Sequence, residues 1–345
     1  MTEQESAYKA AGVDIDAKYR AVRGGQRAIR STFTAGVVSD VGQFGGIFDP
    51  AAAGVAGQLL VASTDGVGTK VMLARQAGRL AGVGADLVQH CVNDILVQGA
   101  RPLFFLDYIA VAKMVEEEVQ ELIEGLAEAC RANDCALLGG ETAEMPGVYR
   151  DNELDVAGTI VGAVARERVL DGSQIRAGDA VIALPSSGLH TNGYSLARRI
   201  VSTLGVGLEE RPEALHGASL ADALLAVHRS YYRAVWPLLE RGVLTGMAHI
   251  TGGGLFDNIP RVVPTGLTVE VRTAAVPRPP IFDYLVEHGD VRGDEAYRVF
   301  NMGFGMVLFA PAAAATAVLE DLQQRGEAAY LAGEVLAGDD GVRLV

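Results

Sequence analysis

Residues 59–70 read LLVASTDGVGTK, a short apolar run that stops at a glycine-rich turn. An apolar run bounded by turn residues predicts a β-strand, here over Leu59–Thr64. The same order recurs, because glycine-rich or serine-rich clusters follow the apolar runs Cys135–Leu138 and Val181–Leu184. We therefore expect several strands to end in loops whose backbone N–H groups are free to meet a ligand.

Other segments extend this pattern over the whole chain. Further strands are expected at Pro102–Ala110, Val156–Val164, Met247–Thr251, Leu267–Val271 and Phe304–Phe309. Apolar residues at helical spacing predict helices over Asp86–Gln98, Val115–Cys130, Tyr194–Val201, Leu220–Leu238, Leu255–Val263 and around residues 318–322. Because strands and helices interleave, the sequence predicts an α/β (α+β) fold.

A polar interval between Val164 and Ala180 separates two halves of similar length. We place a domain boundary there and assign residues 1–168 to an N-terminal domain and residues 169–345 to a C-terminal domain. Clefts between domains are preferred ligand sites, so functional residues are expected where the two halves meet.

Size and composition exclude several classes of protein. A chain of 345 residues suffices for about two domains with cores of their own. With 49% hydrophobic and 21% charged residues, it does not have the composition of a disordered protein. The net charge of −14 would repel polyphosphate, so no nucleic-acid partner is expected. A small anionic ligand is admissible where local donors outweigh the overall charge.

The sequence also predicts a cytoplasmic location. The start, MTEQESAYKA, has polar and acidic residues where a secretory signal has a basic start and an apolar stretch. The most apolar windows, such as Met306–Leu319, are short and are interrupted by proline, so no membrane span is expected. Cys91, Cys130 and Cys135 form no CxxC pair, which favours reduced, buried thiols.

Glycine fills 42 of the 345 positions, and it is gathered into clusters. The cluster at Gly66–Lys70 is not a P-loop, because that motif places lysine before serine or threonine and spaces its glycines differently. It still offers glycines for close approach of the backbone, the Thr69 hydroxyl, the Lys70 cation and the oxygen ligands of Asp65. The alternative is a plain glycine-rich turn with a surface lysine.

Three carboxylates on separate elements, Asp65, Asp94 and Glu141, suit a Mg²⁺–nucleotide. The alternative is that each one caps a helix or faces solvent, and spacing alone does not show that they converge. His90 and Asp94 lie four residues apart, a spacing that also occurs in zinc sites. Because no further His or Cys has ligand spacing, we favour a packed histidine at position 90.

The second half of the chain carries two loops that precede helices. His190, Thr191 and Asn192 crowd one loop, and Gly252–Gly254 forms the other. Helix starts have free N–H groups and favour anions, so each loop is a candidate phosphate or oxyanion site. The alternative for His190 is a turn residue satisfied by neighbouring carbonyl groups. His249, inside a predicted strand, is expected to be structural.

Ten stretches of the sequence together carry a family resemblance. They are Tyr8–Ile15, Thr64–Lys70, Val92–Ala100, Pro102–Tyr108, Gly139–Gly147, Ser186–Gly188, Thr191–Leu196, Thr251–Gly254, Asn258–Val262 and Phe300–Met306. In this order and over nearly the whole chain, they resemble the phosphoribosylformylglycinamidine cyclo-ligase family, the aminoimidazole ribonucleotide synthetases of purine biosynthesis. The glycine-rich segment at residues 42–46 departs from the family pattern, as do Gln43 and Ile47–Pro50.

The resemblance implies a fold and a reaction. The N-terminal domain would bind ATP and Mg²⁺ and contribute strands to a β-barrel across a homodimer interface, and the C-terminal α/β domain would bind substrate. The enzyme, a ligase that forms C–N bonds, would phosphorylate the formyl oxygen of formylglycinamidine ribonucleotide with ATP. Attack by the amidine nitrogen would then close the ring of aminoimidazole ribonucleotide and release ADP and phosphate.

The resemblance also assigns site residues. It implies Asp65, Asp94 and Glu141 as metal ligands, with Lys70, His190 and Asn192 in the catalytic set. The residues implied at the nucleotide or at a phosphate are Asp65, Gly66, Gly68, Thr69, Lys70, Asn93, Gly140, Glu141, Gly252, Gly253 and Gly254. A requirement for K⁺ is left open by the sequence.

Two alternatives remain at this point. One is another enzyme of the same ATP-binding superfamily, such as a selenophosphate synthetase, a thiamine-phosphate kinase or the larger formylglycinamide ribonucleotide amidotransferase. The first would need a reactive N-terminal Cys or Sec and the last a glutaminase domain, and neither is found in the sequence. The other alternative is a catalytically silent nucleotide-binding protein, against which the intact set of Asp65, Lys70, Asp94 and Glu141 argues.

Overall fold

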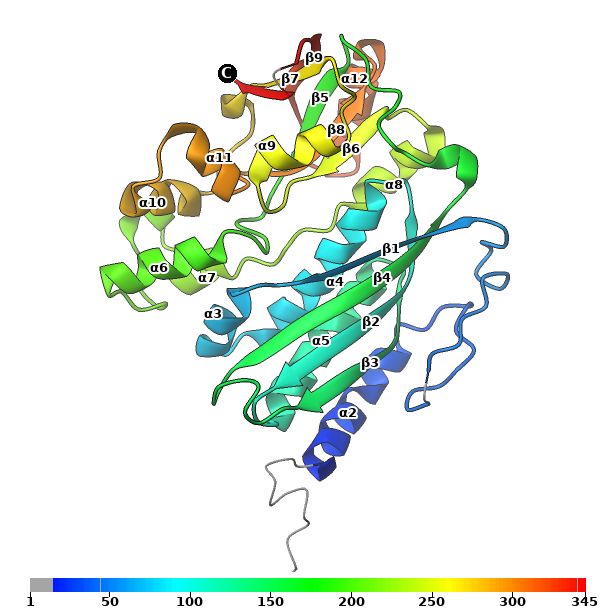
Figure 1. The fold of residues 1–345 in the computed structure, drawn as a ribbon, viewed down its shortest axis with the longest axis vertical. Coiled ribbons are helices and arrows are strands. Elements are labelled where there is room, and N and C mark those ends of the chain that lie inside the picture. Colours follow the sequence, from blue (N-terminus) through cyan, green and yellow to red (C-terminus); the bar gives the residue numbers. More distant parts are fainter. Residues whose placement is uncertain (1–14, 44, 340) are drawn as a thin grey trace, which may run out of the picture.

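The computed structural model describes residues 15–43, 45–339 and 341–345. It contains two β-sheets, each with its own helices, and the second sheet stands above the first in Figure 1. The mixed α/β composition confirms the predicted fold class. The stretch Tyr8–Asp14 and Phe44 of the predicted 42–46 cluster lie outside the described residues.

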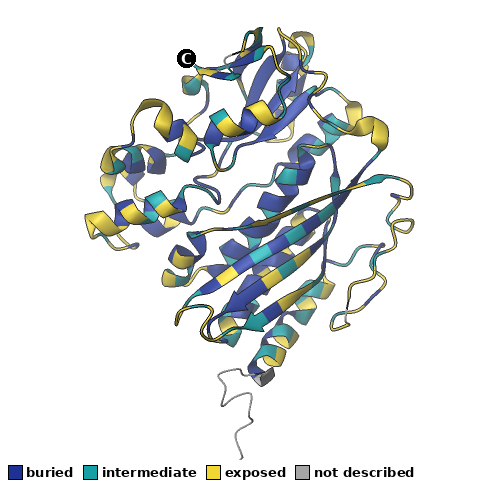
Figure 2. Ribbon diagram, viewed as in Figure 1, coloured by how far each residue is buried: buried dark blue, intermediate teal, exposed yellow. Residues whose placement is uncertain are grey.

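The first sheet has four strands in the order β1 (Leu59–Gly66), β4 (Leu154–Val164), β2 (Arg101–Val111) and β3 (Ala136–Glu144). Only the β2/β3 pair is parallel, and a parallel pair needs a crossover, which α5 (Glu116–Ala132) supplies. The helices of this half are α2 (Ile15–Arg30), α3 (Lys70–Gln76), α4 (Leu80–Leu96) and α5. Helices α4 and α5 cover one face of the sheet and leave the other uncovered (Figures 1 and 2).

Helices α4 and α5 pack unusually closely at two glycines. A Cβ atom on Gly84 would lie 2.3 Å from the carbonyl oxygen of Leu122, and one on Gly125 would lie 1.9 Å from that of Ala81. Both positions therefore need glycine in this packing. The close contact fixes α4 beneath β1 and β4, where its polar side chains reach the end of β1.

The second sheet has six strands, in the order β10 (Gly341–Leu344), β7 (Leu267–Val271), β9 (Tyr330–Ala337), β5 (Ala180–Pro185), β8 (Phe304–Ala310) and β6 (Gly246–His249). Every residue of β8 is buried, as its continuous apolar run requires. The α-helices of this half are α6 (Tyr194–Leu204), α7 (Leu220–Leu224), α8 (Tyr232–Arg241), α9 (Gly254–Asn258), α10 (Pro280–Gly289), α11 (Ala296–Val299) and α12 (Ala312–Gln324).

The single helix predicted over Leu220–Leu238 is wrong. The structure has α7 and α8 there, joined by a non-helical segment from Leu225 to Tyr231. Backbone groups of this segment bond side chains of the first half of the chain: Ala226 accepts from Lys70, and the N–H groups of His228 and Tyr231 donate to Asp86 and Asn93. These bonds replace the helical i to i−4 pattern.

The connection between the sheets runs from the end of β4 at Val164 to the start of β5 at Ala180. The predicted domain boundary at residues 168 and 169 falls within it, and the division into two domains stays a prediction. Cys91, Cys130 and Cys135 are all buried and unpaired. Within the described ranges, no helix combines the length and the apolar character that a membrane crossing requires.

Candidate functional site

Most of the predicted site residues gather in one region, which we call the seam. The seam consists of the turn at residues 65–70, the α4 residues 86–94, and segments 185–194, 225–231 and 249–254. Two close approaches show how it is built: a Cβ on Gly68 would lie 3.8 Å from the carbonyl oxygen of Thr191, and one on Gly252 would lie 3.1 Å from Asn192 Oδ1. Gly68, Asn192 and Gly252 therefore lie near one another, although the sequence separates them widely.

A buried ion pair lies at the base of the seam. Lys70 Nζ is 2.7 Å from Asp86 Oδ2, and both side chains are almost fully excluded from solvent. The ammonium also donates to the carbonyl oxygens of His190, at 3.2 Å, and Ala226, at 2.8 Å. The ion pair and these two hydrogen bonds hold Lys70 inside the protein in this structure, and the catalytic role predicted for it stays a prediction.

Asp65 and Asp94, two of the three acids that the family resemblance implies as metal ligands, lie close together on the open side of the seam, and their metal role stays a prediction. His90 Nε2 lies 2.8 Å from Asp65 Oδ2 and 3.6 Å from Asp94 Oδ2. Asp94 also accepts from Ser63 Oγ at 3.1 Å and from His249 Nδ1 at 2.9 Å. Asp65 and Ser63 share one face of β1, because alternate residues of a strand point the same way.

Both carboxylates are held in the ionised form. Burial alone would raise the pKa of Asp94, but the interactions with His249 and His90 together outweigh it and lower that pKa. For Asp65, burial likewise acts to raise the pKa, but the interactions with His90, the N–H of Gly66 and His249 together outweigh it and lower the pKa. Burial would lower the pKa of His90, yet its bond to Asp65 and the nearby charge of Asp94 raise it. Ionised carboxylates are the state in which a divalent cation binds.

His190 lies inside the seam, where it is almost fully buried, and its ring stacks on that of His228 with centroids 3.9 Å apart. Burial lowers its pKa well below the ordinary value, so the ring is neutral. Its Nε2 accepts the backbone N–H of Ser187 at 3.2 Å. A neutral ring that accepts at Nε2 carries its hydrogen on Nδ1, and that atom is buried without a hydrogen-bond partner among the described residues.

Asn93, predicted near the phosphates, is fully buried and holds the second half of the chain in place. Its Oδ1 accepts the N–H of Tyr231 at 3.0 Å, and its Nδ2 donates to the carbonyl of Arg229 at 2.8 Å. The same Nδ2 lies 3.1 Å from His228 Nε2. The sequence did not single out His228, because it lies in the segment predicted as a continuous helix and has no motif of its own.

Glu141 and Gly140 lie away from the other predicted site residues. In the strand register, Asp65 pairs with Gly158, which pairs with Asp107, which pairs with Gly140. Asp65 on the edge strand β1 and Gly140 on the opposite edge strand β3 are therefore three strand spacings apart, roughly 14 Å. Glu141 is 57% exposed at this far edge, where Lys18 of α2 donates to it at 2.5 Å. A single chain therefore does not bring Glu141 to the ion site of Asp65 and Asp94.

Asp107, which the sequence analysis did not select, explains the glycine at position 140. A Cβ there would lie 2.2 Å from Asp107 Oδ1, so no larger residue fits. Asp107 points to the same side of β2 as Phe105 and Ile109, both fully buried. Burial raises the pKa of Asp107 to about 7, and the negative charge of Glu141 adds to this effect.

Comparisons with known proteins find similarity over nearly the whole chain. Family models described as "AIR synthase related protein, N-terminal domain" and "AIR synthase related protein, C-terminal domain" match residues 48–164 and 176–345. A phosphoribosylformylglycinamidine cyclo-ligase of Geobacillus kaustophilus is 48% identical, with 96% of each chain covered. One from Geobacter sulfurreducens is 45% identical, with 100% of this chain and 99% of the relative covered.

Solved structures of lower identity share the fold. A thiamine-monophosphate kinase of Stenotrophomonas maltophilia superimposes with a TM-score of 0.67 at 19% identity, covering 94% of this chain and 95% of its own. A hydrogenase maturation protein HypE in complex with ATP gives a TM-score of 0.62 at 20% identity, covering 95% of this chain and 88% of its own. At these identities the likeness concerns the fold alone.

The raised pKa of Asp107 predicts a pH dependence of stability. Between pH ~4 and pH ~7 the native chain keeps a proton on Asp107 that the unfolded chain, with an ordinary pKa of 3.8, has released. The free energy of unfolding should therefore fall as pH rises through this window, by up to about 1.4 kcal/mol per pH unit, and level off above it. Asp107→Asn should remove this component in denaturant titrations across the window.

The control is Asp294→Asn, which changes an exposed carboxylate on a surface turn of the second half in the same way. Its pH profile should keep the wild-type slope. An Asp107→Asn profile parallel to that of the wild type would contradict the assignment.

Proposed function

The chain belongs to the phosphoribosylformylglycinamidine cyclo-ligase family and is a ligase, and on that premise we propose that it cyclises formylglycinamidine ribonucleotide. The product would be aminoimidazole ribonucleotide, formed in purine biosynthesis with conversion of ATP to ADP and phosphate. A carbonyl oxygen is a poor leaving group, so its phosphorylation before ring closure accounts for the use of ATP. The proposed setting is the cytoplasm.

One observation above all supports this proposal: the seam joins cation-binding and anion-binding elements from both halves of the chain. Asp65 and Asp94 supply hard oxygen ligands, and the open, exposed backbone of Gly68 and Gly252 borders them. Mg²⁺ is commonly held by one or two carboxylates together with substrate phosphates. The seam is thus suited to a nucleotide on one side and a phosphorylated substrate on the other.

The residues of the seam fit Mg²⁺ and ATP by their chemistry. Asp65 and Asp94 are ionised oxygen donors, and Thr69 Oγ1 is a buried hydroxyl without a hydrogen-bond partner in the described part of the chain. An unpartnered buried hydroxyl is costly unless a ligand completes its bonding. When bound, Mg²⁺ and ATP would supply the activated phosphoryl group, and K⁺ remains a candidate further ion.

The chain's own side chains would mainly position the reactants, which dominates catalysis of phosphoryl transfer. His190 would donate from its unpartnered Nδ1–H to an oxyanion or exchange a proton there, and Asn192 beside Gly252 would orient substrate. Lys70, which holds the carbonyl oxygens of His190 and Ala226, would keep this loop in place. Gly252–Gly254 would receive a phosphate.

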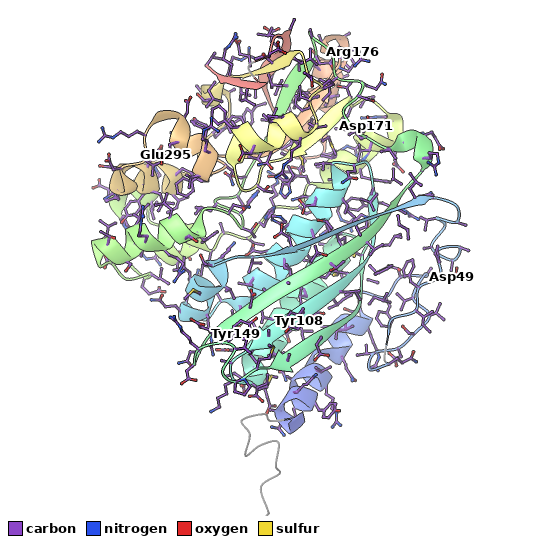
Figure 3. The ribbon with its side chains drawn as sticks, in the orientation of Figure 1. Asp49, Tyr108, Tyr149, Asp171, Arg176 and Glu295 are labelled. Carbon is purple, nitrogen blue, oxygen red and sulfur yellow. The ribbon has the colours of Figure 1, made fainter. Side chains whose placement is uncertain are left out.

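We also propose a homodimer formed through the uncovered face of the first sheet. Leu60, Leu106 and Tyr108 are exposed hydrophobic residues on β1 and β2, and Tyr108 is labelled on this sheet in Figure 3. Exposed apolar side chains that share one uncovered sheet face indicate an interaction surface. Closure of two such sheets, one from each subunit, into a barrel would bury these side chains. It would also offer a route by which the strand edge that carries the partner's Glu141 approaches the site of Asp65 and Asp94.

Sedimentation equilibrium at micromolar concentration should therefore give about twice the chain mass of 36.2 kDa. Leu106→Arg, which places a charge in the proposed interface, should shift the mass towards the monomer, whereas Val148→Arg on an exposed loop should not. A monomeric wild-type protein would rule out the dimer.

The activity itself is tested by turnover with ATP, Mg²⁺ and formylglycinamidine ribonucleotide. ADP, phosphate and aminoimidazole ribonucleotide should appear in equal amounts, and thiamine monophosphate or selenide should not replace the substrate. Asp94→Asn should lower turnover by at least roughly 100-fold, because it removes a charge that neutralises Mg²⁺. The matched change Asp294→Asn, of an exposed carboxylate on a surface turn of the second half, should leave the rate near that of the wild type.

Folding is checked on the same samples by their unfolding transitions. Failure of the folded, ATP-binding wild-type chain to form product would overturn the proposed function. A wild-type rate in Asp94→Asn would overturn only the metal role of that carboxylate.

A further inference from the structure

Three histidines of the seam form a nearly regular triangle that the proposed reaction does not use. The ring centroids of His90, His228 and His249 lie 5.1 to 5.2 Å apart in all three pairs, and the rings meet edge to face at 61° to 69°. One nitrogen of each ring lies within 4.8 Å of the other two. All three side chains are buried.

These separations match those expected around a four-coordinate metal ion. Imidazole nitrogens bind Zn²⁺ at about 2.0–2.1 Å, which in a tetrahedral site separates neighbouring nitrogens by roughly 3.3 Å and ring centroids by roughly 5.2 Å. His228 Nε2 and His249 Nε2 are 3.2 Å apart. The triangle therefore already has the dimensions of a three-histidine site.

The other sides of the rings are anchored as in metal sites. His249 Nδ1 lies 2.9 Å from Asp94 Oδ1, and His90 Nδ1 lies 2.6 Å from Thr191 Oγ1. Ligating histidines commonly bond a carboxylate or another polar group through the second nitrogen, which fixes the ring and its tautomer. The exposed carboxylate of Asp65, 2.8 Å from His90 Nε2, offers an entry path and a nearby oxygen ligand.

The hydrogen-bond pattern also leaves a place for a cation. Asn93 donates from Nδ2 towards His228 Nε2, so this nitrogen presents a lone pair. Because His249 donates from Nδ1 to ionised Asp94, its Nε2 in a neutral ring presents a lone pair as well. These two nitrogens lie 3.2 Å apart, close to the separation of two ligands of one tetrahedral ion.

We propose that His90, His228 and His249 bind a borderline divalent cation such as Zn²⁺, directly beside the carboxylates of Asp65 and Asp94 that are the candidate Mg²⁺ ligands. Imidazole suits zinc and its transition-metal neighbours, whereas Mg²⁺ prefers the oxygen ligands of Asp65 and Asp94. His90 belongs to α4 in the first half of the chain, and the other two belong to the second half. The ion would therefore cross-link the two halves.

The test is titration of the full-length, EDTA-treated protein with Co²⁺, a spectroscopic substitute for Zn²⁺. One ion per chain should bind with the intense visible bands of four-coordinate Co²⁺, without a thiolate charge-transfer band. Zn²⁺ should displace it in equal amount, and a large excess of Mg²⁺ should not. The thermal unfolding midpoint should rise with bound metal.

His228→Gln should weaken Co²⁺ binding at least about 10-fold, while His288→Gln, on α10 away from the seam, should not. Absence of bound ion, six-coordinate spectra that Mg²⁺ abolishes, or a thiolate band would each overturn the proposal. So would unchanged binding in folded His228→Gln. If this variant does not fold, the wild-type spectrum and the competition with Mg²⁺ decide the question.

Discussion

The buried pair of Lys70 and Asp86 is the interaction on which the rest of the seam depends. Burial disfavours both charges, since it lowers the pKa of Lys70 and raises that of Asp86, and each charge offsets the effect on the other. Such a pair is stable only with good geometry and further hydrogen bonds. Here those bonds come from the second half of the chain: the carbonyls of His190 and Ala226, and the N–H of His228.

The pair therefore links the assembly of the two halves to the chemistry of the site. The carbonyl groups that satisfy Lys70 belong to the loop of His190 and Asn192 and to the segment that presents His228. The open turn of Asp65 and Gly68 continues directly into Lys70 and α3. One buried ion pair thus determines where the candidate cation ligands of α4 and β1 lie relative to the candidate anion loops of the second sheet.

Much of the fold could be predicted because it depends on local pattern. Leu267–Val271 was predicted and observed with the same bounds, since an isolated apolar run between turns has few alternatives. The helix over Leu220–Leu238 failed because Asp86, Asn93 and Lys70, distant in sequence, bond its backbone. Glu141 was grouped with Asp65 because the sequence does not reveal the order of strands, which places them at opposite edges. His228 carries no local motif, so only its neighbours in space identify it.

The central claim is that Lys70 and Asp86 stabilise the seam as a coupled pair, and a double-mutant cycle of unfolding free energies tests it most directly. Lys70→Met and Asp86→Asn, each of similar size to the residue replaced, should each cost about 3–5 kcal/mol, because each leaves a buried partner uncompensated. The double variant should cost less than the sum of the two by at least about 1 kcal/mol. Additive losses, or single losses below about 0.5 kcal/mol, would contradict the claim.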